Sequence, residues 1–261
     1  MKSDVIRSRN NPVVRRLREL KARADADLAL VEGPKLLGEA VSAGIGIVEV
    51  AAAPGMALPE MRGASVWALA PDIVASLSET ETSQGVLAIV RRPSFEEDAF
   101  FRAPALVLVA VGVQNPGNLG GLLRTAEAAG ASGAYLATGC ADPFSWKALR
   151  GSMGSAFRLP QWRGLESEEA LRRVHQRGLL TLAADAHGEA AYDQLDLRGP
   201  AALVVGAEGA GLPEALARAV AHRVRIPMHG AAESLNVGVA AGVLLFEAAR
   251  QRRAWPLLPL V

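Results

Sequence analysis

The stretch ALVLVAVGVQNPGNLGGLLRTAEAAG, residues 105–130, is the most informative part of the chain for predicting the fold. Its first nine residues are apolar or glycine, and such a run is typical of a parallel strand that is covered on both faces. A short polar and glycine-rich loop follows, and an amphipathic helical pattern then occupies residues 119–129. A strand, a loop and a helix in this order predict an α/β fold built on a parallel sheet.

The residues downstream repeat this alternation of strand and helix. Apolar runs occur at residues 134–137, 179–184 and 201–205, a mixed strand is predicted at 223–226, and helical patterns occupy 168–176 and 213–220. Alternation of this kind favours helices on both faces of the sheet. The long apolar helix predicted at 236–253 exceeds what one amphipathic face needs, so we interpret it either as a homo-oligomer interface or as core.

The residues upstream form a second unit. Strands are predicted at about 28–31, 45–51, 66–69 and 86–90, and helices at about 10–23, from 34 and at 71–77. This pattern predicts a small α/β domain over residues 1–92. Residues 93–104 are bracketed by prolines and hold an acidic cluster, so we interpret them as the linker. The second domain then covers residues 105–261.

Charge is distributed unevenly along the chain. The 261 residues carry a formal net charge of only +1, yet residues 1–23 hold eight basic side chains against two acidic ones. In the helix predicted at 10–23, the apolar positions recur at helical spacing and leave the arginines largely on the other face. This face is either a solvated helix surface or a patch that contacts phosphates.

The composition excludes several classes of protein. A single cysteine, Cys140, cannot form an intramolecular disulfide, and the four histidines show no ligand spacing, so we expect no zinc or other metal site. The first residues lack the apolar core of a signal peptide, and no stretch approaches about 18 uninterrupted apolar residues. We therefore expect a cytoplasmic protein that is neither secreted nor membrane-spanning.

Polar residues gather in three loops at predicted strand ends, where open α/β sheets place their ligands. Asn118 and Arg124 occur in the first loop and its helix, and Asn118 is expected to cap that helix. Glu208 stands among three glycines in the second loop. Ser234 and Asn236 precede the terminal helix. Each loop taken alone also fits a plain structural role, as a capped helix or a tight turn.

Generic nucleotide-binding motifs fit these loops poorly. The glycines around Glu208 have the order G-x-x-G-x-G, the reverse of the dinucleotide fingerprint, although Asp142 lies about 20 residues beyond Gly120, where that motif places its ribose-binding acid. Residues 33–38 have the glycine spacing of a P-loop but continue with Glu39. No G-x-S-x-G elbow is present, so a hydrolase is not supported. A nicotinamide-dependent oxidoreductase, which would bind a dinucleotide at the Gly120 loop, is an alternative.

Three segments in this order resemble the motifs of the SpoU (TrmH) family of RNA ribose 2'-O-methyltransferases, within the SPOUT superfamily. They are NPGNLGGLLRTAEAAGA, VVGAEGAGLP and IPM...ESLNVGVAAG, and the likeness covers residues 105–253. The upstream segments RSRNNPVVRRLRELKAR and LVEGPKLLGEAV resemble the small ribosomal-protein-like substrate-binding domain of many members.

The resemblance implies a parallel sheet whose carboxy-terminal segment is threaded into a trefoil knot, with S-adenosylmethionine bound in the knotted loops. It also implies a homodimer in which the first motif of one subunit completes the methyl-donor pocket of the other, and this would give the apolar terminal helix a partner. The implied activity is 2'-O-methylation of a ribose in structured RNA. Sequence arithmetic alone would favour an unknotted sheet.

Matched position by position, the resemblance implies two sets of site residues. The residues implied to contact the methyl donor are Gly206, Ile226, Met228 and Leu235. The polar set around the target ribose comprises Asn118, Arg124, Glu208, Ser234 and Asn236. The family proposal makes the residue matching Arg124 the general base, but a guanidinium holds its proton with a pKa above about 12. Arg124 could instead fix a phosphate and stabilise the developing alkoxide, with Ser234 or a water relaying the proton.

The RNA target is expected to be ribosomal, namely 23S rRNA, because the amino-terminal extension is a folded domain and the carboxy terminus, WPLLPLV, is short and apolar. A tRNA methyltransferase and a non-catalytic RNA-binding protein are the alternatives. Trp146 either stacks on an unpaired base or is packed. The residues expected to contact RNA are Arg15, Arg16, Arg18, Lys21, Lys35, Lys147 and Arg150.

Overall fold

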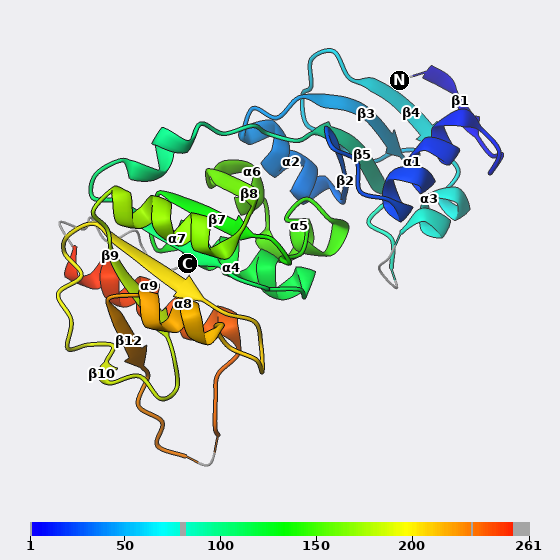
Figure 1. Cartoon of the computed structure of the whole chain (residues 1–261). Coiled ribbons are helices and arrows are strands. Elements are labelled where there is room, and N and C mark those ends of the chain that lie inside the picture. Colours follow the sequence, from blue (N-terminus) through cyan, green and yellow to red (C-terminus); the bar gives the residue numbers. More distant parts are fainter. Residues whose placement is uncertain (1, 79–81, 231, 253–261) are drawn as a thin grey trace. The chain divides into compact units, whose positions relative to one another are not determined.

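The computed structural model describes residues 2–78, 82–230 and 232–252 (Figure 1). Contacts between residues divide the chain into two compact units. The first unit comprises Met1–Ser94, Leu119–Arg124 and Ala141–Arg158, and the second comprises Phe95–Asn118, Thr125–Cys140 and Leu159–Val261. The boundaries expected from the sequence, 1–92, 93–104 and 105–261, remain a prediction.

The first unit is built on a sheet that has five strands within the described residues, in the order β1-β4-β3-β5-β2. Its strands are β1 (Lys2–Ile6), β2 (Leu28–Glu32), β3 (Ile47–Ala52), β4 (Ser65–Leu69) and β5 (Val86–Arg91). Strand β5 is antiparallel to both of its neighbours, whereas β4 is parallel to β1 and β3. The helices of this unit are α1 (Pro12–Ala22), α2 (Pro34–Ser42), α3 (Pro71–Leu77), α5 (Trp146–Ser152) and α6 (Ser155–Arg158).

Helix α1 forms as its sequence pattern predicts. Asn11 caps it by accepting a hydrogen bond of 2.9 Å from the Val13 amide, and Pro12 suits the first turn. Val14 and Leu17 are fully buried in the core of the unit. Most of the basic side chains of α1 are therefore left on its exposed face. Strand β1, which precedes the helix, carries no periodic signal and was missed by the sequence reasoning.

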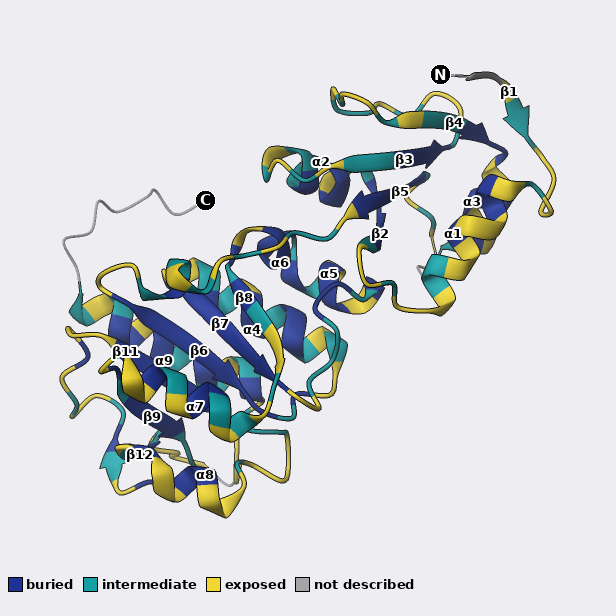
Figure 2. Cartoon of the chain, turned by 45° about the horizontal axis from the view of Figure 1, so that its top comes forward, coloured by how far each residue is buried: buried dark blue, intermediate teal, exposed yellow. Residues whose placement is uncertain are grey.

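The second unit is built on a parallel sheet with seven strands within the described part of the chain, in the order β10-β12-β9-β11-β6-β7-β8. The strands are β6 (Leu106–Ala110), β7 (Gly133–Ala137), β8 (Gln161–Leu165), β9 (Leu180–Ala184), β10 (Ala190–Ala191), β11 (Ala201–Val205) and β12 (His222–Arg225). Every residue of β6, β7 and β11 is buried, as Figure 2 shows. The parallel sheet predicted from the apolar run is thus confirmed. The trefoil knot stays a prediction.

Helices cover both faces of this sheet. The helices of the second unit are α4 (Pro116–Ala128, its middle turns grouped with the first unit), α7 (Ser167–Gln176), α8 (Glu214–Ala219) and α9 (Val237–Gln251). Val107, Val109 and Val204 pack in one core cluster with α7 and α8. The alternate strand residues point away from that cluster and are also buried, and α9 contacts β9 and β11.

Part of the expected linker is folded onto the second unit. Residues Glu97–Phe101 form a 3₁₀ helix, η1, whose Phe100 is fully buried and lies 5.0 Å from the Tyr135 ring in an edge-on arrangement. The Tyr135 hydroxyl donates to Glu97, which also pairs with Arg173 at 2.7 Å. Burial raises the pKa of Tyr135, and the bond to Glu97 raises it further, so the hydroxyl keeps its proton.

No helix among the described residues is long and apolar enough to cross a membrane.

Replacing Phe100 by alanine should destabilise the protein, because the cavity would open between η1 and Tyr135. We expect the free energy of unfolding to fall by about 3–5 kcal/mol, measured by denaturant titration. The neighbouring Phe101 is only partly buried and lies against Arg177, so Phe101→Ala is the matched control with a smaller loss. Equal losses in the two variants would contradict the account of the linker.

Candidate functional site

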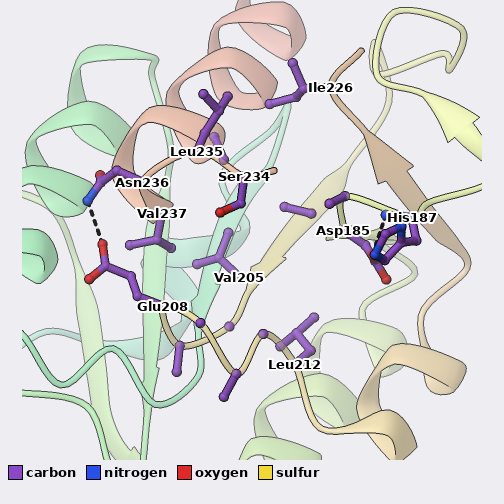
Figure 3. A pocket seen from close by; sticks show the side chains of 18 of the residues that line it. Asp185, His187, Val205, Glu208, Leu212, Ile226, Ser234, Leu235, Asn236 and Val237 are labelled. Atoms are coloured by element: carbon purple, nitrogen blue, oxygen red, sulfur yellow. Dashed lines mark hydrogen bonds between the residues drawn. The ribbon is translucent and has the colours of Figure 1, made fainter. Parts of the chain in front are cut away.

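A pocket of about 690 Å³ lies at the carboxyl ends of three neighbouring strands, β12, β9 and β11 (Figure 3). Its walls are the segments that follow these strands and the approach to α9. The residues that line it include Gly206, Glu208, Ile226, Met228, Ser234, Leu235 and Asn236. The structure thus brings together all four residues expected at the methyl donor and three of the polar set. Their individual roles remain predictions.

The loop after β11 needs glycine for its shape. A Cβ at Gly206 would lie 2.3 Å from the carbonyl carbon and oxygen of Gly211, far inside contact distance. The amide of Gly211 donates to the carbonyl of Ala207 at 2.9 Å, and Gly209 and Gly211 have φ values of +80° and +66°. Close approach at Gly206 and left-handed backbone at the other two therefore explain the three glycines.

Glu208 joins the three polar loops through its carboxylate. Asn118 donates from Nδ2 to one carboxylate oxygen at 2.6 Å, and Asn236 donates from Nδ2 to the other at 2.6 Å. The Asn236 amide also lies 3.4 Å from Oδ1 of Asn118. In Figure 3, the side chains of Glu208 and Asn236 point toward one another and are joined by the hydrogen bond between them. Both oxygens are committed to amide donors, so the carboxylate holds the loops in place.

The helix caps differ from the expectation. Asn115, and not Asn118, caps α4, because its Oδ1 accepts from the amides of Gly117 and Asn118. The prediction that Asn118 caps the helix was therefore wrong: the helix begins at Pro116, and Asn118 lies in its first turn with its side chain on Glu208. Asn236 caps α9 by accepting from the Gly238 amide at 2.9 Å.

Arg124 lies on α4, six residues after Asn118, and is exposed. At 3.6 residues per turn, this spacing places it about 9 Å along the helix axis and roughly 120° around it from Asn118. Asn118 and Arg124 therefore leave the same helix in different directions.

A second polar pair at the pocket was missed by the sequence reasoning. Asp185 follows β9 and accepts from Nε of Arg223 at 2.9 Å and from the His187 amide at 2.8 Å. Partial burial acts to raise the pKa of Asp185, but these two bonds outweigh it and hold the pKa below its ordinary value. The only sequence signal for Asp185 is its position directly after a strand, the same rule that singled out Glu208, whereas Arg223 lies within β12.

The residues expected to contact RNA fall into two groups. Most are exposed: Arg15, Arg16, Arg18, Lys35, Lys147 and Arg150. Arg16 nevertheless pairs with Glu49 at 3.2 Å. Lys21 donates from Nζ to the carbonyls of Leu77 and Ser78, so it supports the end of α3. A contact with RNA remains a prediction for all seven.

The structure does not support two roles considered from the sequence, a ribose-binding role for Asp142 and a base-stacking role for Trp146. Asp142, considered as a ribose-binding acid, is held by a two-pronged ion pair with Arg92 at 3.0 and 2.7 Å. Trp146 is packed in the core of the first unit and so is not placed to stack on a base. No cluster of three or more potential metal ligands occurs among the described residues.

A parallel α/β sheet with a glycine-lined pocket at its carboxyl edge, preceded by a small α/β unit, defines a ligand-binding α/β protein with an accessory domain. The sequence model of the SpoU rRNA Methylase family matches residues 105–246, and that of the MRM3-like substrate binding domain matches residues 11–88. The chain belongs to the SpoU rRNA methylase family.

Relatives are similar to this chain over nearly its whole length. The 23S rRNA (guanosine(2553)-2'-O)-methyltransferase RlmP of Bacillus subtilis is 32% identical over 89% of this chain and 92% of its own. The SpoU methyltransferase AviRb of Streptomyces viridochromogenes, solved in complex with the cofactor AdoMet, is 30% identical with a TM-score of 0.83, covering 93% and 98% of the two chains. An AdoMet-bound rRNA methyltransferase of Sinorhizobium meliloti is 31% identical with a TM-score of 0.81, covering 95% and 97%.

Substituting Gly206 by alanine should disrupt the loop after β11, because the new Cβ would collide with the Gly211 backbone. We expect a loss of about 1–3 kcal/mol in the free energy of unfolding. Gly230→Ala, in an open stretch where a Cβ meets no atom within 4 Å, is the matched control and should change stability little. Denaturant titration measures both, and an unaffected Gly206→Ala protein would refute the close approach.

Proposed function

We propose that this protein transfers a methyl group from S-adenosylmethionine to the 2'-hydroxyl of a ribose in RNA. The observation that carries the proposal is the Glu208 carboxylate held by Asn118 and Asn236 at the mouth of a glycine-lined pocket. This arrangement places polar side chains from all three family segments at one opening. The names of the relatives, RNA 2'-O-methyltransferases, support the same activity.

The pocket fits S-adenosylmethionine, which supplies a sulfonium methyl group when bound. Its volume lies within the range of about 300–1,000 Å³ that is usual for small-molecule sites. Ile226, Leu235 and Val237 offer apolar surface for a purine ring, and Gly206, which lines the pocket, has no side chain to cover its backbone. Gly206, Ile226, Met228 and Leu235 would hold the donor, largely through the backbone.

The polar residues act on the ribose. The 2'-hydroxyl must lose its proton to be an effective nucleophile. Arg124 is a permanent cation rather than a base, so it acts by fixing the adjacent phosphate and stabilising the developing alkoxide. Ser234, exposed at the pocket, or a water molecule accepts the proton of the 2'-hydroxyl and passes a proton on to solvent. Asn118, Glu208 and Asn236 are positioning residues.

The substrate we favour is 23S rRNA. RlmP and the uridine(2479) methyltransferase of Streptomyces viridochromogenes are both named for 23S rRNA, and their sequences align with 89% and 71% of this chain. The match to a substrate-binding domain over residues 11–88 supports a role of the first unit in RNA recognition. Exposed basic side chains on α1 supply the charge that phosphate contacts require.

A homodimer accounts for the exposed apolar face of α9. Val239 and Phe246 are 53% and 43% exposed, and they stand seven residues apart on one side of the helix with Val243 between them. Arg124 leaves α4 in a direction different from Asn118, so a partner subunit is the natural recipient of its guanidinium. The first segment of one subunit would then complete the pocket of the other.

Replacing Arg124 by alanine should lower the rate of methyl transfer to RNA by about 10²–10³-fold, because the alkoxide loses its stabilising charge. Transfer of labelled methyl from S-adenosylmethionine to cellular RNA measures this. Arg198→Ala removes an exposed arginine that pairs with Asp196 on another surface, and it should leave the rate unchanged. Equal incorporation by wild type and Arg124→Ala would remove Arg124 from the mechanism.

Phe246→Glu should convert the dimer to monomers, since a charge would be buried in the apolar interface. Sedimentation velocity measures the change in mass. Ala215→Glu adds the same charge at an exposed position of α8 and should leave the mass unaltered. A wild-type protein that sediments as a monomer would overturn the assignment of this face.

A further inference from the structure

Residues 141–158, here named the docking segment, belong by their contacts to the first unit, although the chain reaches them from strand β7 of the second. The segment contains α5 and α6. Residues 119–124 of helix α4 belong to the same unit. The docking segment therefore shares one packed body with both the amino-terminal sheet and the part of α4 that carries Arg124.

One side of the docking segment is anchored in the amino-terminal core. Trp146 is only 8% exposed and packs in the cluster that holds Val14 and Leu17 of α1. The amine of Lys21 lies 5.6 Å from the centre of the Trp146 ring. Helix α5 also contacts β2, at the end of the sheet order (Figure 1). The segment thus covers the edge of the sheet and extends its core.

Two ion pairs strengthen this anchorage. Arg92, whose side chain is 7% exposed, bonds both oxygens of Asp142 and donates from Nε to the Leu28 carbonyl at 2.9 Å. A buried arginine with this set of partners is costly to disturb, because its charge would lose its compensation. At the other end of the segment, Arg158 pairs with Glu39 of α2 at 2.6 Å.

The opposite side of the docking segment meets α4 backbone to backbone. A Cβ at Gly120 would lie 2.3 Å from the Ala148 carbonyl oxygen and 2.9 Å from the Ser152 amide. Glycine is therefore required for α4 and α5 to approach this closely. Gly120 is one helical turn before Arg124, so any displacement here moves the base of that side chain.

We propose that the docking segment sets the position of Arg124 relative to the amino-terminal sheet, with Gly120 as the positioning residue at the contact. The packing thereby fixes the position of the Arg124 guanidinium, which acts on the ribose, relative to RNA bound on the basic face of α1. This inference rests on the proposed function and names the structural path by which substrate binding and catalysis are aligned. Gly120 itself touches neither RNA nor methyl donor.

Gly120→Ala tests the proposal, with Gly121→Ala as its matched control, because a Cβ at Gly121 meets no atom within 4 Å. We expect Gly120→Ala to lower the single-turnover rate of methyl transfer by about 10²-fold, the cost of misplacing a reacting group by an ångström. The affinities for RNA and for S-adenosylmethionine should stay at wild-type values. An unchanged rate, or a loss of RNA affinity as large as the loss of rate, would overturn the proposal.

A second measurement is independent of activity and of the folding of Gly120→Ala. Asp142→Ala breaks the pair with Arg92, and amides 119–124 should then exchange hydrogen at least about tenfold faster, while those of β11 are unaffected. Asp98→Ala, which breaks an exposed pair with Arg177, is the control. Unchanged exchange of amides 119–124 in Asp142→Ala would overturn the proposal, even if the wild-type protein methylates RNA. Faster exchange would support the packing of α4 on the docking segment, even if the wild-type protein does not methylate RNA.

Discussion

The carboxylate of Glu208 is the contact on which the arrangement of the site depends. It accepts one hydrogen bond from an asparagine 90 residues upstream and another from an asparagine 28 residues downstream, each at 2.6 Å. Bonds to a charged acceptor are stronger than those between neutral groups. Glu208 therefore links the start of α4 and the start of α9 to the glycine loop. Asn236 also caps α9, because its Oδ1 accepts a hydrogen bond from the Gly238 amide.

The parallel sheet brings these segments to one edge, and much of it could be predicted from the sequence. Strands β6, β7 and β11 are buried on both faces, so their sequences are continuous apolar runs, and such runs predict strands of a parallel sheet. Strand β8 has only one buried residue, the polar Gln161, and β10 is two residues long, so neither produces a comparable pattern. Their pairing comes from tertiary contacts with stronger neighbours.

Local sequence was a poorer guide to the site and to the packing of α5. Asn115 and Asn118 are both good capping residues, and only the start of the helix at Pro116 decides between them. Trp146 and Asp142 lie in the family segment of the second domain, yet their partners are in the first unit, at separations that no periodicity encodes. Lys21 donates to carbonyls 56 and 57 residues further along the chain, and no local pattern in the sequence indicates this structural contact.

The structure thus describes a small α/β unit and a glycine-lined pocket whose polar residues come from three segments of the chain. The most direct test of this account is mass-spectrometric mapping of 2'-O-methyl nucleotides in ribosomal and transfer RNA from cells with and without the protein. We predict that one nucleotide of 23S rRNA loses its methyl group without the protein and regains it when the wild-type chain is restored. Identical methylation of every RNA in the two kinds of cell would contradict the account.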